Sequence, residues 1–279
     1  MGAAISCTAV ADPRRRPSVR LGVLTDCHYA DKTPAGSRHY RDSLTKVRQA
    51  VARFNAAEAS LAIELGDFVD AAPEVDTEVE YLKTIDAEYA KFHGDRHYVL
   101  GNHCVFTLTK EEFIYNSAAL AAHYSFDRGD FHFVVLDACY RADGVSYGRR
   151  NFDWKDTNLP AAELDWLRAD LAAAGKPTVV FVHQRLDLDP VGENAAYAVK
   201  NAPAVRGVLE ASGKVLAVFQ GHSHENLYRH IGGIHYCVMR AVVEGPGAEN
   251  NGYALVDLFD DGSIRIDGFR KQAGYQWNG

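Results

Sequence analysis

Five apolar segments of this chain each end in a short cluster of Asp, Asn or His, and this recurrence constrains the fold more than any other feature. The clusters are Asp26-Cys27-His28, Gly66-Asp67-Phe68-Val69-Asp70, Gly101-Asn102-His103, His183 and Gly221-His222-Ser223-His224. Each follows an apolar run typical of a buried strand. In open α/β sheets, sites assemble beyond the carboxyl ends of the strands. The sequence therefore predicts that these side chains gather at one sheet edge.

Strand and helix patterns alternate through most of the chain and give way to strands alone after His224. Strands are expected at 19–25, 61–65, 97–100, 123–126, 131–137, 178–182, 215–220, 227–230, 234–238, 253–258 and 264–269. Helices are expected at 40–55, 76–92, 160–174 and 202–211, the second capped by Asp76. This order predicts an α/β domain with mixed sheets. The irregular stretch 138–159 is long enough to be a functional loop or a lid.

Composition excludes several classes of protein. No stretch of the 279 residues approaches the ~20 unbroken apolar residues of a membrane span, so we expect no span. The net charge of −7 disfavours a nucleic-acid partner, which a basic surface would attract. The five cysteines are odd in number and scattered, without a C-x-x-C pair, which argues against a disulfide scaffold or a zinc-thiolate site.

The N-terminal segment leaves two interpretations open. Residues 3–11 are small and apolar and end in an A-x-A pattern, but no basic region precedes them. We expect a flexible tail over residues 1–18, a single domain over 19–279 and a cytoplasmic location, which free thiols also fit. The alternative is an exported protein whose signal peptide is truncated at its front.

The polar clusters contain the ligand types that divalent metal ions prefer. Carboxylate oxygens, an amide oxygen and imidazole nitrogens suit Mn²⁺, Fe²⁺ or Zn²⁺. Taken singly, each cluster is as easily a turn or a buried core histidine, but five of them after five strands argue against coincidence. Seven candidate ligands are too many for one tetrahedral ion and fit two. Two ions about 3.5–4 Å apart clamp the attacking and leaving oxygens of a phosphoryl displacement.

In this order, the clusters resemble the motifs of the calcineurin-like metallophosphoesterase superfamily, from Asp26 to His224. The resemblance implies a four-layer αββα sandwich of two mixed sheets with a dinuclear metal site. It also implies a role for each matched residue. Asp26, His28 and His224 would hold one ion, Asn102, His183 and His222 the other, Asp67 would bridge both, and His103 would be the general acid. Asp70 matches no ligand and either orients His103 or caps a turn.

A narrower likeness concerns the segments around the motifs. Tyr29-Ala30-Asp31-Lys32 and Asn151-Phe152-x-Trp154 resemble the manganese-dependent ADP-ribose/CDP-alcohol diphosphatase branch, although that branch often has Gln at the position of His28. Four arginines near these segments would form a phosphate-binding rim, and each taken alone also fits a surface charge. They are Arg38, Arg41, Arg149 and Arg150.

Two residues depart from the superfamily pattern. Cys104 stands where Asp or Glu is common, and Arg185 stands where Pro is common. Arg185 either meets a substrate phosphate or pairs with a carboxylate such as Asp187. Neither departure removes a candidate ligand, but either one alters the surroundings of the site.

These observations predict a dinuclear metal-dependent phosphohydrolase. Its two ions would be Mn²⁺, Fe²⁺/Fe³⁺ or Zn²⁺, and a metal-bridging hydroxide would attack the phosphorus of a small phosphorylated substrate. We expect that substrate to be a phosphodiester or a diphosphate of a nucleotide or an alcohol. The alternatives are a phosphomonoesterase that uses the same site and a non-catalytic scaffold on a phosphoesterase fold. The sequence leaves the oligomeric state open.

Overall fold

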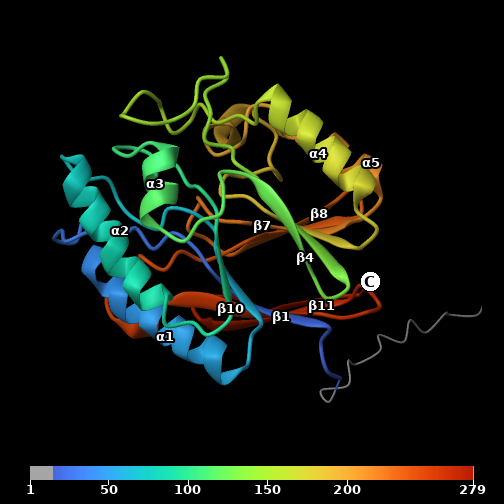
Figure 1. The fold of residues 1–279 in the computed structure, drawn as a ribbon, viewed down its shortest axis with the longest axis horizontal. Coiled ribbons are helices and arrows are strands. Elements are labelled where there is room, and N and C mark those ends of the chain that lie inside the picture. The colour runs from blue at the N-terminus through green and yellow to red at the C-terminus, as the bar shows by residue number, and fades with distance from the viewer. Residues whose placement is uncertain (1–14, 279) are drawn as a thin grey trace, which may run out of the picture.

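The structure, a computed structural model, describes residues 15–278 and contains two six-stranded sheets (Figure 1). The first sheet has the order β12-β11-β10-β1-β2-β3, with a parallel half and an antiparallel half. Its parallel strands are β1 (Val19–Leu24), β2 (Leu61–Glu64) and β3 (Asp95–Tyr98). Its antiparallel strands are β10 (Gly252–Leu258), β11 (Ile264–Arg270) and β12 (Tyr275–Trp277).

The second sheet has the order β4-β5-β6-β7-β9-β8 and is parallel at its centre. The parallel strands are β5 (Phe131–Val135), β6 (Thr178–Phe181), β7 (Val215–Gln220) and β9 (Ile234–Val238). The edge strands β4 (Tyr124–Arg128) and β8 (Leu227–Ile231) are antiparallel to their neighbours. The two sheets are therefore both mixed, as the alternation of patterns predicts.

Three apolar cores between successive layers hold the fold together. The two sheets pack face to face through side chains such as Ile63, Phe133 and Phe181. Helices α1 (Ser43–Ala56) and α2 (Val75–Tyr89) cover the outer face of the first sheet. Helices α4 (Ala161–Ala173) and α5 (Ala202–Ser212) cover the outer face of the second (Figure 1). Burial on both faces explains why central parallel strands such as β6 and β7 are almost continuously apolar, and the four-layer αββα sandwich is confirmed.

Several details differ from the sequence-based expectations. The capping assignment of Asp76 is wrong: α2 starts at Val75 after Glu74, and Asp76 lies in the first turn, where the helix dipole still favours a carboxylate. The segment 40–42 is a 3₁₀ turn ahead of α1, and β3 lies two residues earlier than expected. The short strand β12 was not expected from the sequence.

The helix α3 (Lys110–Asn116) was also missed, although the sequence contains a signal for it. Thr109 accepts a hydrogen bond from the Glu112 backbone, and the Glu112 carboxylate accepts one from the Thr109 backbone. This reciprocal capping box, spaced T-x-x-E, marks a helix start. In contrast, residues 138–159 contain no helix or strand, so the long irregular segment is confirmed.

The division into a tail and one domain stays a prediction. Residues 1–14, which carry most of the expected tail and the candidate signal remnant, lie outside the described residues. Within 15–278, no helix has the combined length and apolar character needed to cross a membrane.

Candidate active site

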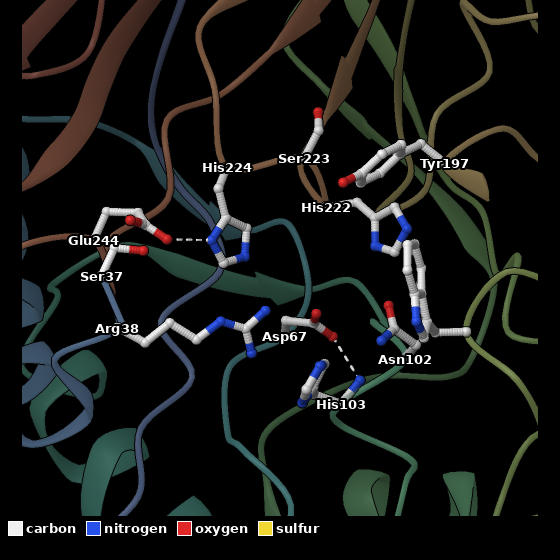
Figure 2. Close-up of a pocket in the computed structure, with 11 residues that line it drawn as sticks. Ser37, Arg38, Asp67, Asn102, His103, Tyr197, His222, Ser223, His224 and Glu244 are labelled. Carbon is white, nitrogen blue, oxygen red and sulfur yellow. Dashed lines mark hydrogen bonds and ion pairs between the residues drawn. The ribbon is translucent and has the colours of Figure 1, made fainter. Parts of the chain in front are cut away.

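The five predicted clusters meet where the parallel strands of both sheets end, and Figure 2 shows side chains from three of them: Asp67, Asn102 with His103, and His222 with His224. Those from the first sheet follow β1, β2 and β3, and those from the second follow β6 and β7. Within each sheet, backbone hydrogen bonds tie the strand ends together: Asp26 N donates to Gly66 O at 2.9 Å, and Gly221 N donates to His183 O at 3.0 Å. Between the sheets, His222 N donates to Asp26 Oδ2 at 3.0 Å. The seven candidate ligands therefore reach one place because the strand ends from two sheets adjoin.

Asp26, His28 and His224 form a first group whose ligand atoms all lie within 4.8 Å of one another. Asp26 Oδ1 lies 3.4 Å from His224 Nε2 and 3.6 Å from His28 Nε2. The two Nε2 atoms are 3.1 Å apart. All three side chains are buried or nearly so, and their donor atoms point at a common centre.

Asp67, His183 and His222 form a second group of the same kind. Asp67 Oδ2 lies 3.1 Å from His183 Nε2, which lies 3.3 Å from His222 Nδ1. Asn102 is 4% exposed, and its Oδ1 is buried without a hydrogen-bond partner among the described residues. Asp67 Oδ2 is also 3.6 Å from His28 Nε2, which places this carboxylate between the two groups.

The backbone at these positions is strained. Nine residues other than glycine have a positive φ within 15–278, and five of them are candidate ligands. Those five are Asp26, His28, Asp67, His222 and His224. Left-handed backbone is costly for side-chain-bearing residues and persists where the surrounding structure enforces it, often at functional sites. The strain is thus concentrated on the candidate ligands.

Glycine at position 101 allows the second strand end to approach the third. A Cβ on Gly101 would lie 2.2 Å from both the backbone nitrogen and Oδ1 of Asp67. The missing side chain lets Asp67 Oδ1 accept a hydrogen bond from His103 N at 2.7 Å. The Gly101-Asn102-His103 motif therefore has a packing reason for its first residue as well as a chemical reason for the others.

Outer hydrogen bonds fix the orientation of two candidate histidine ligands. His183 Nδ1 lies 2.9 Å from Leu65 O, and His224 Nδ1 lies 2.7 Å from Glu244 Oε1. Each contact assigns a proton to Nδ1, so that Nε2 faces the centre and would become the electron-pair donor to an ion once it has lost its own proton. Metal-binding histidines in proteins are typically held in this way.

The charges in the cluster compensate one another. Burial alone would raise the pKa of Asp26, but the charges of His183 and His224 outweigh it and hold the pKa well below its ordinary value. Burial would lower the pKa of His224, yet Asp26 and Glu244 raise it to about 9. Burial lowers the pKa of His28 to about 4, so this imidazole is neutral at pH 7. Protons on the histidines thus supply the positive charge that the buried carboxylates require.

His103 is held by Asp70 and lies at the edge of the cluster. Asp70 Oδ1 is 2.6 Å from His103 Nδ1 and also accepts a hydrogen bond from Ala71 N at 3.0 Å. Burial would raise the pKa of Asp70, but the hydrogen bond and charge of His103, with His28 and Lys32, lower it. Asp70 therefore takes the first of the two roles that the sequence left open: it orients His103.

A cavity of about 410 Å³ opens over the cluster (Figure 2). Its lining includes Asp67, Asn102, His103, His222 and His224. Arg38 also lines it, and five further lining residues were not assigned to the site from the sequence: Ser37, Trp154, Tyr197, Ser223 and Glu244. The sequence signals two of these, Ser223 through its place in the Gly221–His224 cluster and Trp154 through the motif in the 138–159 loop.

The five candidate phosphate-binding arginines are placed differently. Only Arg38 lines the cavity, where Figure 2 shows its guanidinium directed toward Asp67. Arg41 pairs with Asp31, Arg149 with Glu112, and Arg150 donates to the carbonyls of Ala72 and Pro73.

Arg185 takes the second of its two open interpretations. It is 4% exposed and forms two hydrogen bonds to Asp187, at 2.8 and 2.6 Å. It borders a smaller cavity beside the site and touches Ser223 Oγ at 3.3 Å.

The donor set fits divalent ions. Oxygen and nitrogen donors without thiolate suit Mn²⁺ and related ions, and Asn102 Oδ1 is a buried acceptor that lacks a hydrogen bond. His28 Nε2 and His224 Nε2, at 3.1 Å, converge as two ligands of one ion would. Asp70, His103 and His28 form a third group of possible ligands. The hydrogen bond between Asp70 and His103 explains why these two side chains are close, without an ion between them.

The fold and the site together define a metallophosphoesterase. The family model of the calcineurin-like phosphoesterases matches residues 19–226, and the chain belongs to this family. The predicted superfamily resemblance is therefore confirmed.

Two relatives by sequence and one solved structure are similar to this chain over most of its length. A manganese-dependent ADP-ribose/CDP-alcohol diphosphatase from Arabidopsis thaliana is 25% identical over 88% of this chain and 93% of its own length. A protein of the same name from Oryza sativa subsp. japonica is 23% identical over 88% and 90%. In structure, the chain is similar to a dimetal phosphatase from Danio rerio, with a TM-score of 0.81, 19% identity and coverage of 94% and 99%.

Substitution of Gly101 by alanine tests whether close approach at this strand end shapes the site. We expect Gly101→Ala to displace Asp67 and weaken Mn²⁺ binding roughly tenfold or more, as changes next to metal ligands do. Titration calorimetry with Mn²⁺ measures it, and circular dichroism checks the fold. Gly175→Ala is the control, because a Cβ there meets nothing within 4 Å. Unchanged binding by a folded Gly101→Ala variant would contradict the account.

Proposed function

We propose that this protein is a dinuclear metal-dependent phosphohydrolase that cleaves phosphodiester or diphosphate bonds in a nucleotide- or alcohol-type substrate. The observation that carries the proposal is the convergence of two adjoining ligand groups, with Asp67 between them, beneath an open cavity. The diphosphatase names of the relatives support the substrate class, and the family supports hydrolysis.

Each candidate ligand is assigned to one of two ions. Asp26, His28 and His224 would hold the first ion, and Asp67 would bridge both. Asn102, His183 and His222 would hold the second. When bound, two such ions polarise phosphoryl oxygens and make a hydroxide nucleophile available at neutral pH. Manganese is the metal that the names of the relatives suggest.

His103 is the proposed general acid. Asp70 accepts the Nδ1 proton, so Nε2 is the atom left to act on a substrate in the cavity that His103 lines. In the protonated ring, Nε2–H would donate its proton to the leaving oxygen as the P–O bond breaks. The Asp70 carboxylate stabilises this cationic ring and holds its orientation. Arg38, the one candidate arginine that lines the cavity, would contact a phosphoryl oxygen.

Two aromatic rings beside the candidate ligands favour a substrate that carries a flat group. The centroid of Trp154 lies 5.4 Å from that of Tyr197 and 5.6 Å from that of His222. Tyr197 is 40% exposed and lines the cavity, so part of its ring is open to a bound ligand. Stacking on such rings contributes about 1–3 kcal/mol per base. The rings of Trp154 and Tyr197 therefore favour a nucleotide-type substrate over a simple phosphomonoester.

The proposed compartment is the cytoplasm. Cys27, Cys104, Cys139 and Cys237 are all buried and free, as expected for a protein kept under reducing conditions. Subcellular fractionation tests this assignment, and recovery from an exported fraction would contradict it.

Metal-stripped protein tests the proposed reaction. We expect no hydrolysis until Mn²⁺ is added, and then faster cleavage of ADP-ribose and CDP-alcohols than of a monoester. Asp67→Ala should lose this activity because the shared ligand is gone, whereas Asp165→Ala, at an exposed ion pair, should keep it. Preference for the monoester would favour a phosphomonoesterase. Absence of cleavage with both ions bound would favour the scaffold alternative.

The proposed role of His103 predicts a dependence on the leaving group. His103→Ala should retain Mn²⁺ binding and lower kcat by ~10²–10⁴-fold for alkyl leaving groups. The loss should shrink for p-nitrophenyl esters, whose leaving oxygen needs no proton. His93→Ala, which changes an exposed histidine outside the site, should behave as wild type. An equal loss for every leaving group would instead assign His103 to phosphate positioning.

A further inference from the structure

Lys46 is a buried lysine in α1 whose ammonium group binds only backbone carbonyls. The residue is 0% exposed, and Nζ donates to Val242 O at 2.7 Å, Glu244 O at 3.0 Å and Gly245 O at 2.8 Å. Within residues 15–278, no carboxylate lies within 4.0 Å of this nitrogen. All three N–H groups of the ammonium therefore donate to carbonyls of one short segment of chain.

That segment, residues 241–247, also contacts the strand end that carries a candidate ligand. Val242 N donates to Thr25 O at 3.0 Å, and Val243 N donates to Asp26 O at 3.1 Å. Gly245 N donates to Ser37 O at 2.8 Å, next to the arginine that lines the cavity. The segment has no regular secondary structure of its own, so its position depends on these bonds, on those from Lys46, and on two more, from His39 N to Val243 O at 2.9 Å and from Gly247 N to Asp42 Oδ2 at 2.8 Å.

The segment reaches the metal cluster through Glu244. Its carboxylate is 2.7 Å from Nδ1 of His224 (Figure 2). Nε2 of the same ring lies 3.4 Å from Asp26 Oδ1. Because Nζ donates to the carbonyl of Glu244 itself and to those of Val242 and Gly245, a shift of Lys46 would move this carboxylate. A chain of direct contacts therefore runs from α1 to one candidate ligand of the first ion.

We propose that Lys46 is a positioning residue for the first metal ion and acts through Glu244 on His224. The ammonium fixes the 241–247 segment so that the Glu244 carboxylate holds the His224 ring with Nε2 toward the ion. Lys46 touches neither substrate nor ion. The inference rests on the proposed dinuclear centre and extends it to a residue that the family motifs do not contain.

Calorimetric titration of Mn²⁺ into Lys46→Met tests this role. Loss of an outer partner typically costs 10–100-fold in metal affinity, so we expect one of the two binding steps to weaken by at least about tenfold. The other step should stay within about twofold, and the exchange-coupled Mn²⁺ pair signal should vanish at a concentration that saturates wild type. Lys214→Met is the matched control, because Nζ of Lys214 also donates to two carbonyls, Leu171 O and Ala172 O, outside the site.

A double-mutant cycle separates positioning from general stability. If Lys46 acts through Glu244, then Glu244→Ala should weaken the same step, and the double variant should be little worse than either single one. Three results would overturn the proposal. Lys46→Met could weaken both binding steps equally, it could leave both steps unchanged, or its effect could add to that of Glu244→Ala. If Lys46→Met does not fold, Lys46→Gln, which keeps two donors, decides by the same criteria. Wild type that binds no Mn²⁺ would instead refute the metal centre itself.

Discussion

Two buried carboxylates, Asp26 and Asp67, impose the requirement that organises this site. Both are almost inaccessible to water, and an isolated ionised carboxylate at such a position costs on the order of several kcal/mol. Burial would raise the pKa of Asp67, but His183 and His103 lower it. Opposite charge close to these oxygens is therefore necessary for the fold as described. Protonated His183 and His224 supply this positive charge in the structure. Two divalent ions would supply it instead, and the histidines would release their protons as the ions bind.

The surrounding architecture delivers the carboxylates and the imidazoles to the same point. Each sheet contributes parallel strands, and the inner core between the sheets holds their carboxyl ends together. This convergence constrains the backbone. Five of the candidate ligands adopt left-handed backbone, and a side chain at Gly101 would collide with Asp67. Outer contacts from Leu65 and Glu244 then select the ring nitrogen that faces inward. A site made in this way is preorganised, because little has to move when a ligand binds.

Local sequence patterns were sufficient to predict the mixed sheets and the ligand cluster, whereas the four layers were implied by the resemblance to the superfamily. The cluster was predictable because parallel strands bring their ends to one edge, so that five short motifs imply one site. For Arg185, the pairing with Asp187, two residues away, was one of the alternatives that the sequence offered. The contacts of Arg149 and of Arg20, which no motif marks, were not predictable, because their partners Glu112 and Asp257 are distant in sequence. Glu244 and Lys46 lay beyond prediction for the same reason. Helix α3, in contrast, was predictable, because the T-x-x-E capping box at Thr109 marks its start, but the sequence-based prediction did not include it.

The central claim is that this chain holds two metal ions at the shared ends of its sheets. Anomalous diffraction at the manganese edge from crystals grown with Mn²⁺ measures this directly. The account predicts two peaks about 3.5–4 Å apart, as in two-metal hydrolases, on either side of the Asp67 carboxylate. One should lie among Asp26, His28 and His224, and the other among Asn102, His183 and His222. A single peak, or peaks away from these side chains, would contradict it.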